Sequence, residues 1–359
     1  MASPTTIILF LIAIIFPFGQ LFRLNLNSVS FPLIDLAIFA LFLVNLTSHL
    51  KNPKVKNKFF LYFLPFALFS LIYNLISYQA NPLKPILYFF RLAVYLSFFI
   101  FPLNPKNISQ PFKHFFKLSL LTCIVFGFIQ YLFWPNATFF DSFNWDPHLH
   151  RLIGSFFDPT FTGLIFLLFL INLYLSPSKK PKYFLIFTSY VAMALTYSRS
   201  TLLSFLFGSF LISRKQKNIK ILIVGIIITL ATVLLLPRQP GESTKLERSS
   251  SITAKIENYK EAWDLFCRSP IIGHGYNNLF VARHIDNPSS HSNFGFDGSL
   301  MTILATTGIL GFFLFSRGLI HLYLNSSPPK KISLAIILLH SFFANSLLYP
   351  WVFLYFILS

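Results

Sequence analysis

Long apolar blocks alternate with short polar connections along most of the 359-residue chain. A helix that crosses a bilayer needs about 20 mostly apolar residues, and most of these blocks approach that length. The pattern predicts an all-α, polytopic membrane protein with about eleven transmembrane helices, within a range of about ten to twelve. The blocks cover residues 5–22, 31–49, 59–77, 85–103, 114–134, 160–176, 183–197, 200–213, 219–237, 299–324 and 332–358.

Two places in this pattern are irregular. The blocks 183–197 and 200–213 are short and are separated only by a polar Ser-Arg-Ser sequence. This predicts either a tight hairpin or two tilted, incomplete spans. The last block, 332–358, is long and contains Pro350, which predicts a possible division into two pieces.

One long polar segment, residues 238–298, separates the blocks in the last third of the chain. Apolar side chains recur in it at spacings of three and four residues, which predicts an amphipathic helix from about Ser251 to Cys267. These side chains are Ile252, Ile256, Tyr259, Trp263 and Phe266. We expect this stripe to pack against the outer membrane surface or the ends of the spans.

The composition excludes a soluble globular protein. The chain is 55% hydrophobic and only 11% charged, and a soluble fold of this length would have too little interior for so many apolar blocks. The first block has no basic residue before it and no small-residue cleavage site after it, so we expect a retained helix and not a secretory signal. Cys123 and Cys267 lie in an apolar and a polar stretch, which argues against a disulfide or a metal site.

The basic residues indicate topology. Although the formal net charge is +18, the lysines and arginines are scattered between apolar blocks and form no stripe that would suggest nucleic acid binding. Most of them fall in every second connection, which the positive-inside rule assigns to the cytoplasm. The pattern therefore predicts a multi-pass membrane protein with a cytoplasmic N-terminus and with loop 238–298 outside.

Three arginines lie apart from the basic connections. Arg151 and Arg199 fall at predicted outer ends of spans, and Arg91 lies about two turns below such an end. Taken singly, each is expected to extend its guanidinium to the lipid headgroups, and Arg91 alternatively lines a polar cleft. Taken together, they are suited to bind phosphate oxygens, because guanidinium donates to such groups in pairs. Both interpretations remain open at this point.

A series of motifs carries a family resemblance. The stretches RLIGSFFDPTFTG, the Ser-Arg hairpin, SITAKIENYKEAWDLFCRSPIIGHGYNNLF and DGSLMTILATTGILGFF occur in this order between residues 145 and 320. In order and spacing they resemble the motifs of the O-antigen ligase and O-antigen polymerase superfamily. The resemblance divides the chain into N-terminal transmembrane helices (1–134), a ligase- or polymerase-like core (135–325) that includes loop 238–298, and a C-terminal transmembrane segment (326–359).

The resemblance implies an enzyme of surface polysaccharide (O-antigen-like) biosynthesis. Such enzymes transfer or polymerise a glycan from a polyprenyl-pyrophosphate carrier to a sugar or lipid-linked acceptor at the outer face of the cytoplasmic membrane. The implied partners are this donor, the acceptor and membrane lipids, with no nucleic acid, no nucleotide sugar, no metal and no cofactor. The chemistry requires cations for the leaving pyrophosphate and a base for the acceptor hydroxyl.

The family's cations transfer to particular positions. Arg151 matches the arginine that opens the first motif, and Arg199 matches the arginine of the hairpin. Where related proteins often have a loop arginine four residues before an aromatic, this chain has Lys255, which keeps the charge but loses the forked geometry. Arg248 is the alternative candidate, and Arg91 is a further candidate cation for the pyrophosphate.

Two residues are candidates for the base. The family's ligase-like members have a histidine eleven residues before the final glycine pair, and here that position holds Asp297, while His291 lies six residues earlier. Asp297 also precedes the apolar helix, where we expect it to act as an N-cap. His291 has the pKa range that suits a general base. We expect Gly308 and Gly311 to allow close packing of helices.

Two other classes compete with this function. The first is a transporter or flippase for a lipid-linked saccharide, but such proteins usually carry carboxylates and broken helices near the membrane midplane. The second is a catalytically inactive membrane scaffold, which the changes at Lys255 and Asp297 favour. Because the polar groups gather at one predicted face, the pattern favours surface chemistry over passage.

Overall fold

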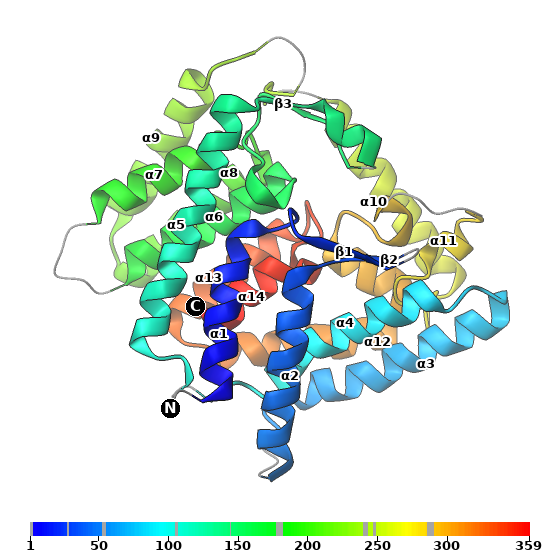
Figure 1. Ribbon diagram of the computed structural model, residues 1–359. Coiled ribbons are helices and arrows are strands. Elements are labelled where there is room, and N and C mark those ends of the chain that lie inside the picture. Colours follow the sequence, from blue (N-terminus) through cyan, green and yellow to red (C-terminus); the bar gives the residue numbers. More distant parts are fainter. Residues whose placement is uncertain are drawn as a thin grey trace. The chain divides into compact units, whose positions relative to one another are not determined.

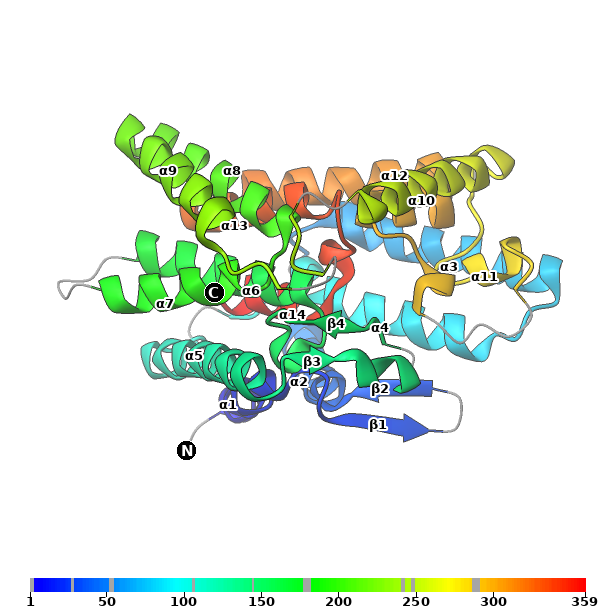
Figure 2. The same ribbon diagram turned by 90° about the horizontal axis from the view of Figure 1, so that it is seen from above.

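A computed structural model describes residues 3–26, 29–51, 55–104, 107–143, 145–176, 182–239, 243–246, 249–285 and 291–359 (Figures 1 and 2). The chain forms two compact units, which are described separately. The first contains residues Met1–Ile15, Phe22–Phe115 and Ile252–Ser326, and the second contains Phe16–Leu21, Phe116–Ser251 and Ser327–Ser359. Both units are built mainly from helices, as the hydrophobic pattern predicts.

The first unit combines helices from the N-terminal third of the chain with helices from Ile252–Ser326. Its helices are α1 (Pro4–Ile15), α2 (Leu33–Lys51), α3 (Lys58–Tyr78), α4 (Leu83–Ile100), most of α10 (Ser250–Arg268), α11 (Leu279–Ala282) and α12 (Ser299–Leu324), with the 3₁₀ turn η5 (His291–Phe294). The strands β1 (Arg23–Leu26) and β2 (Val29–Pro32) form an antiparallel hairpin in which Arg23 pairs with Pro32. The hydrophobic pattern did not predict this hairpin.

The helix α3 packs along α12 (Figure 1). Its buried polar residues donate hydrogen bonds to the backbone of α12 and of the loop that precedes α11. The Asn57 amide donates to the carbonyl of Gly318 over 2.9 Å, and the Asn74 amide donates to the carbonyl of Gly273 over 3.0 Å. The Ser70 hydroxyl lies against the carbonyls of Ile272 and Thr306. Each contact satisfies a buried polar group, as an apolar solvent requires.

The helix α12 is broken at Gly308, where φ is 62° and ψ is −170°. Beside the break, the backbone of the loop that follows α10 supplies hydrogen bonds: Ile309 N–H donates to Pro270 over 2.8 Å, and Gly275 N–H donates to Thr306 over 2.8 Å. A Cβ at Gly308 would collide with the carbonyl of Ile271. The glycine is therefore needed for its conformation and for the crossing loop backbone, which corrects the expectation of simple helix packing.

The second unit surrounds α6 (Pro159–Leu175), whose residues from Thr162 to Ile171 are all buried. Its other elements are η1 (Phe16–Phe18), most of α5 (Gln110–Phe133), β3 (Asn136–Ala137), η3 (Thr138–Phe143), β4 (His148–Leu149), η4 (Gly154–Phe156), α7 (Tyr183–Ala194), α8 (Arg199–Gln216), α9 (Ile219–Leu235), α13 (Pro328–His340), η6 (Ser346–Leu348) and α14 (Pro350–Leu358). The helices α7, α8, α13 and α14 all pack against α6.

The helix α9 has the polarity expected of a helix in lipid. Its buried residues are Gly225, Thr229 and Thr232, which form one narrow stripe toward α8. Its exposed residues include Ile223, Val224, Ile226, Ile227, Leu230, Leu234 and Leu235. Small and hydroxyl residues at a helix contact with aliphatic residues outward are typical of membrane helices, because lipid solvates the aliphatic side chains.

The helices support a multi-pass membrane protein. Within the described residues, five helices are long and apolar enough to cross a bilayer, namely α2, α3, α4, α5 and α12. Shorter apolar helices include Pro159–Leu175, Tyr183–Ala194 and Ile219–Leu235. The number of about eleven spans and the orientation in the membrane remain predictions. The division of the last block at Pro350 is confirmed, since α13 and α14 are separate helices.

Candidate functional site

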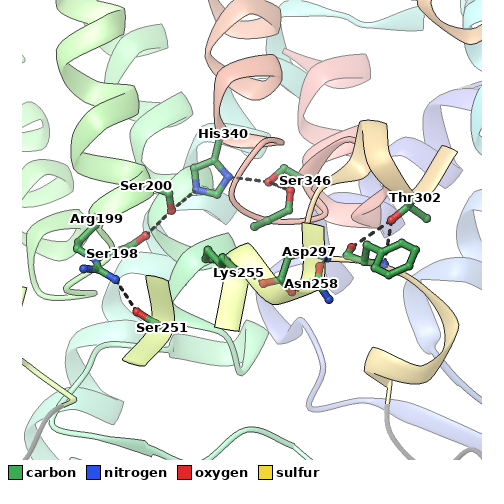
Figure 3. Close-up of polar contacts among 12 residues, drawn as sticks. Ser198, Arg199, Ser200, Ser251, Lys255, Asn258, Asp297, Thr302, His340 and Ser346 are labelled. Atoms are coloured by element: carbon green, nitrogen blue, oxygen red, sulfur yellow. Dashed lines mark hydrogen bonds and ion pairs between the residues drawn. The ribbon is translucent and has the colours of Figure 1, made fainter. Parts of the chain in front are cut away.

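Arg199 is the first residue of α8 in the second unit (Figure 3). Ser198 has an extended backbone and caps this helix, because its hydroxyl accepts the N–H of Thr201 over 3.3 Å. The half-buried Arg199 guanidinium donates to the carbonyl of Leu246 over 3.2 Å and to the hydroxyl of Ser251. Arg199 thereby connects Leu246 and Ser251, the second residue of α10, to the N-terminus of α8.

This position gives Arg199 a suitable environment for an anion. The first N–H groups of a helix lack intrahelical acceptors and carry partial positive charge. A guanidinium at the same end adds a full charge and a set of donors in one plane. Together they can receive phosphate oxygens, which bind readily at such helix ends.

Arg151 points into the second unit. Its side chain is only 8% exposed, and its guanidinium donates to the carbonyl of Thr196 over 2.9 Å and to that of Tyr197 over 3.4 Å. The Leu152 N–H also donates to the carbonyl of Leu195 over 2.9 Å. Arg151 therefore holds the turn that precedes Arg199, and the alternative in which its guanidinium extends to the headgroups is wrong.

The rest of the first motif explains this arrangement. The Gln130 side chain on α5 accepts the N–H groups of Ile153 and Gly154 over 2.8 and 3.2 Å. Gly154 has a φ of 55°, a conformation that glycine adopts without strain. Asp158 caps α6 by accepting the N–H groups of Thr160 and Phe161. The motif thus fixes the backbone on which Arg151 stands.

In the first unit, Lys255 of α10 pairs with Asp297 (Figure 3). The Lys255 ammonium lies 2.9 Å from the Asp297 carboxylate, and both side chains are partly exposed. The Asn258 side chain accepts the N–H of Asp297 over 2.9 Å. An exposed pair of this kind contributes at most about 1 kcal/mol to stability, so its main effect is on local charge.

Asp297 does not cap α12. The N-cap position is Gly298, and among the described residues no side chain caps this helix. The expectation of an Asp297 cap was therefore wrong, because the carboxylate is directed to Lys255 instead. The Tyr259 hydroxyl lies close to Gly298, since a Cβ there would be 2.7 Å from it. Burial, and then the charge of Asp297, raise the pKa of Tyr259.

Sequence reasoning missed Asn258 and Tyr259 as companions of Asp297. A signal was present, because both follow Lys255 by three and four residues and so share its side of the helix. Tyr259 was assigned to the apolar stripe. The structure exposes Ile252, Ile256 and Trp263, whereas the buried side of α10 contains Ala262 and Leu265. The helix itself, predicted from Ser251 to Cys267, is confirmed at Ser250–Arg268.

The loop histidines differ in their surroundings. His291 begins η5, but its side chain lies outside the described part of the structure, as does Arg248 altogether. His274 is 3% exposed; its Nε2 lies 2.8 Å from the Leu265 carbonyl. Burial is the main cause that lowers the pKa of His274. His274 therefore belongs to the core of the first unit, and the exposed His284 takes a positive φ of 56°.

Arg91 has a carboxylate partner. Its Nε lies 3.0 Å from the Asp35 carboxylate at the first turn of α2, and the Tyr95 hydroxyl donates to the same carboxylate over 2.9 Å. The Arg91 guanidinium also lies 6.0 Å from the ring of Tyr88. The charge of Arg91 is thus matched within the first unit. Its expected role as a phosphate ligand is therefore less favoured than that of Arg199.

Comparison with known proteins places these residues in a family context. Residues 184–316 match the family model described as O-antigen ligase. This segment, about a third of the chain, is similar to O-antigen ligases. No curated protein matches the chain. The match confirms the resemblance drawn from the motifs and supports the wider ligase and polymerase superfamily.

The segment that matches the O-antigen ligase model runs from α7 into α12 and contains Arg199, Lys255, His291 and Asp297. Arg151 and Arg91 precede it. The segment therefore includes the α8 N-terminus with its arginine and the Lys255–Asp297 pair. It indicates a glycosyltransferase type of activity in surface polysaccharide biosynthesis, on lipid-linked glycans at a membrane.

Proposed function

We propose that this protein transfers or polymerises a saccharide carried on polyprenyl pyrophosphate, at the outer face of the cytoplasmic membrane and without a metal or a nucleotide sugar. The acceptor is a sugar or a lipid-linked glycan. The observation that carries the proposal is the guanidinium of Arg199 at the N-terminus of α8, within the segment that matches the O-antigen ligase model. In this proposal the N-terminus of the chain is cytoplasmic and loop 238–298 lies outside.

The reaction breaks the bond between the anomeric carbon of the donor sugar and a pyrophosphate oxygen. The acceptor hydroxyl oxygen forms the new bond to that carbon and gives its proton to a base, while the electron pair of the broken bond remains on the carrier pyrophosphate. Arg199 and the first N–H groups of α8 stabilise this developing negative charge. Arg151 acts through the turn at Thr196 and Tyr197, which it holds in place.

The helix α10 connects the proposed donor and acceptor groups along the chain. Its first turn contains Ser251, whose hydroxyl accepts a hydrogen bond from the Arg199 guanidinium, and its next turn contains Lys255. We propose that the Lys255–Asp297 pair orients the acceptor and that His291 is the base. A carboxylate paired with an ammonium is a poorer proton acceptor, because the positive charge stabilises its ionised form.

The variants His291→Ala and Asp297→Asn separate these roles. We expect His291→Ala to reduce turnover by about two to four orders of magnitude, the usual range for losing positioned acid-base catalysis. Asp297→Asn should keep substantial activity, because asparagine still accepts a hydrogen bond from Lys255. Steady-state turnover in membranes at equal protein abundance measures both. Normal turnover in His291→Ala with an inactive, folded Asp297→Asn would assign the base to Asp297.

A lipid-linked saccharide flippase is the competing function, and the Arg91–Asp35 ion pair inside the helical part of the first unit favours it. Deletion of the gene in the native bacterium distinguishes the two. Loss of a transferase should leave lipid-linked glycan accumulated on the outer leaflet, where a membrane-impermeant oxidant reaches it in intact cells. Accumulation that becomes reactive only after permeabilisation would contradict transfer and indicate transport.

A further inference from the structure

A buried histidine outside the matched family segment is linked to the N-terminus of α8. His340, the last residue of α13, is fully buried in the second unit. Its Nε2 lies 3.2 Å from the Ser200 hydroxyl, and its Nδ1 lies 2.6 Å from the Ser346 hydroxyl (Figure 3). The Thr201 hydroxyl also lies 3.4 Å from Nε2. The imidazole thus joins α8 to the turn that ends in η6.

The hydrogen bonds continue to the residues on either side of Arg199. The Ser200 hydroxyl lies 3.0 Å from that of Ser198, and the Thr201 hydroxyl donates to Ser198 over 2.8 Å. Ser198 is the N-cap of α8, so Arg199 stands between two serines of this network. The position of the guanidinium therefore depends on a chain of contacts that ends at His340.

One set of donor directions satisfies this chain. The Ser346 hydroxyl donates to the carbonyl of Ala344, so its oxygen can accept a hydrogen bond from the Nδ1–H of His340. The Nε2 atom is then the acceptor, and the Ser200 hydroxyl donates to it. Ser198 in turn donates to the Ser200 oxygen. A histidine suits this place because it supplies one donor and one acceptor at opposite sides of a rigid ring.

We propose that His340 is a positioning residue for the donor pyrophosphate, acting through Ser200 on the α8 N-terminus and on Arg199. The inference rests on the proposed role of Arg199. It adds that α13, which lies beyond the O-antigen ligase match at residues 184–316, is part of the donor site. Unlike a purely structural link, this role depends on the Nε2 contact more than on the Nδ1 contact.

Substitution of His340 by glutamine or by asparagine distinguishes the roles of the two ring nitrogens. A glutamine side chain reaches about as far as Nε2 and can accept from Ser200, whereas asparagine reaches only about as far as Nδ1 and can donate to Ser346. The probe is farnesyl pyrophosphate, with its binding to the purified full-length protein in detergent measured as a dissociation constant. Monodispersity and thermal unfolding report whether each variant is folded.

We expect His340→Gln to bind the probe within about threefold of the unsubstituted protein and His340→Asn to bind at least about tenfold more weakly. Ser200→Ala should weaken binding of the probe as much as His340→Asn does. The double variant Ser200→Ala/His340→Asn should bind no more weakly than either single variant, because both substitutions remove the same contact. Equal binding by the folded asparagine and glutamine variants would overturn the inference. If His340→Asn does not fold, unchanged binding by Ser200→Ala overturns it instead.

Arg199→Ala in the same assay separates this inference from the proposed function. If Arg199→Ala binds the probe normally, the assignment of Arg199 fails, and the role of His340 fails with it. If Arg199→Ala loses binding while His340→Gln and His340→Asn bind the probe equally, only the proposed role of His340 is wrong. Retained binding in Ser346→Ala would confirm that the Nδ1 side is not the decisive contact.

Discussion

Arg199→Ala is expected to reduce glycan transfer on the order of 10²- to 10³-fold, the usual effect of removing one donor that stabilises transition-state charge. The substitution removes a guanidinium at the N-terminus of α8 and its contacts to Leu246 and Ser251. In this proposal, the N–H groups at the start of α8 then remain to stabilise the negative charge on the leaving pyrophosphate. Initial rates of transfer, at saturating and limiting donor, measure the loss in membranes of equal protein content.

Two variants act as controls for this result. Arg199→Lys keeps the positive charge but not the planar set of donors, so it should restore transfer only partly. Arg214→Ala removes the same charge from the last turn of the same helix, where the guanidinium lies over the ring of Phe210. It should transfer at nearly the normal rate. Equal losses in Arg199→Ala and Arg214→Ala would indicate a general effect of charge on the membrane protein.

Gly308→Ala is expected to prevent normal folding of the first unit. The backbone at Gly308 has a φ of 62° and a ψ of −170°, a region that is essentially restricted to glycine. Strain alone costs about 1–3 kcal/mol, and the new Cβ would also collide with the backbone of Ile271. The yield of monodisperse protein after extraction and its thermal unfolding midpoint measure the effect, and both should fall sharply.

The nearby Gly311→Ala is the matched control. A Cβ at Gly311 would also be crowded, by the Thr307 hydroxyl, but it meets no crossing loop backbone among its nearest atoms. Gly308 is the residue of α12 with non-helical φ and ψ, so alanine at position 311 adds no backbone strain of that kind. We therefore expect a smaller loss of the unfolding midpoint than for Gly308→Ala. Similar losses of the unfolding midpoint in Gly308→Ala and Gly311→Ala would contradict the prediction that Gly308 is required for the break in α12.

The sequence predicts helices well where apolar length alone decides them. The blocks at 31–49, 59–77 and 219–237 correspond closely to α2, α3 and α9, because burial in lipid leaves no alternative to a helix that satisfies its own backbone. The amphipathic helix α10 follows from its period. The break in α12 was not predictable from hydropathy, since it depends on a loop backbone that crosses at Gly308.

The candidate site was predictable by residue type but not by contact. Arg199 and Arg151 were predicted as site residues because they lie apart from the basic connections. Only the structure shows that Arg151 donates to carbonyls of the turn before Arg199. Arg91 appeared unpaired because its partner, Asp35, lies on another helix 56 positions earlier in the sequence. The contact of His340 with Ser200 was not predictable, because nothing in the local sequence links two residues that lie 140 positions apart.

The central claim is that Arg199 stabilises a leaving carrier pyrophosphate during glycan transfer. The most direct measurement uses purified protein in liposomes with a polyprenyl-pyrophosphate-linked glycan from the native bacterium as donor and with lipid-linked glycans from the same cells as acceptors. Free polyprenyl pyrophosphate and the elongated acceptor are quantified together by mass spectrometry. The account predicts that both form in equal amounts with the unsubstituted protein and that both nearly disappear with Arg199→Ala. Movement of intact lipid-linked glycan across the bilayer without release of carrier, unchanged in Arg199→Ala, would contradict it.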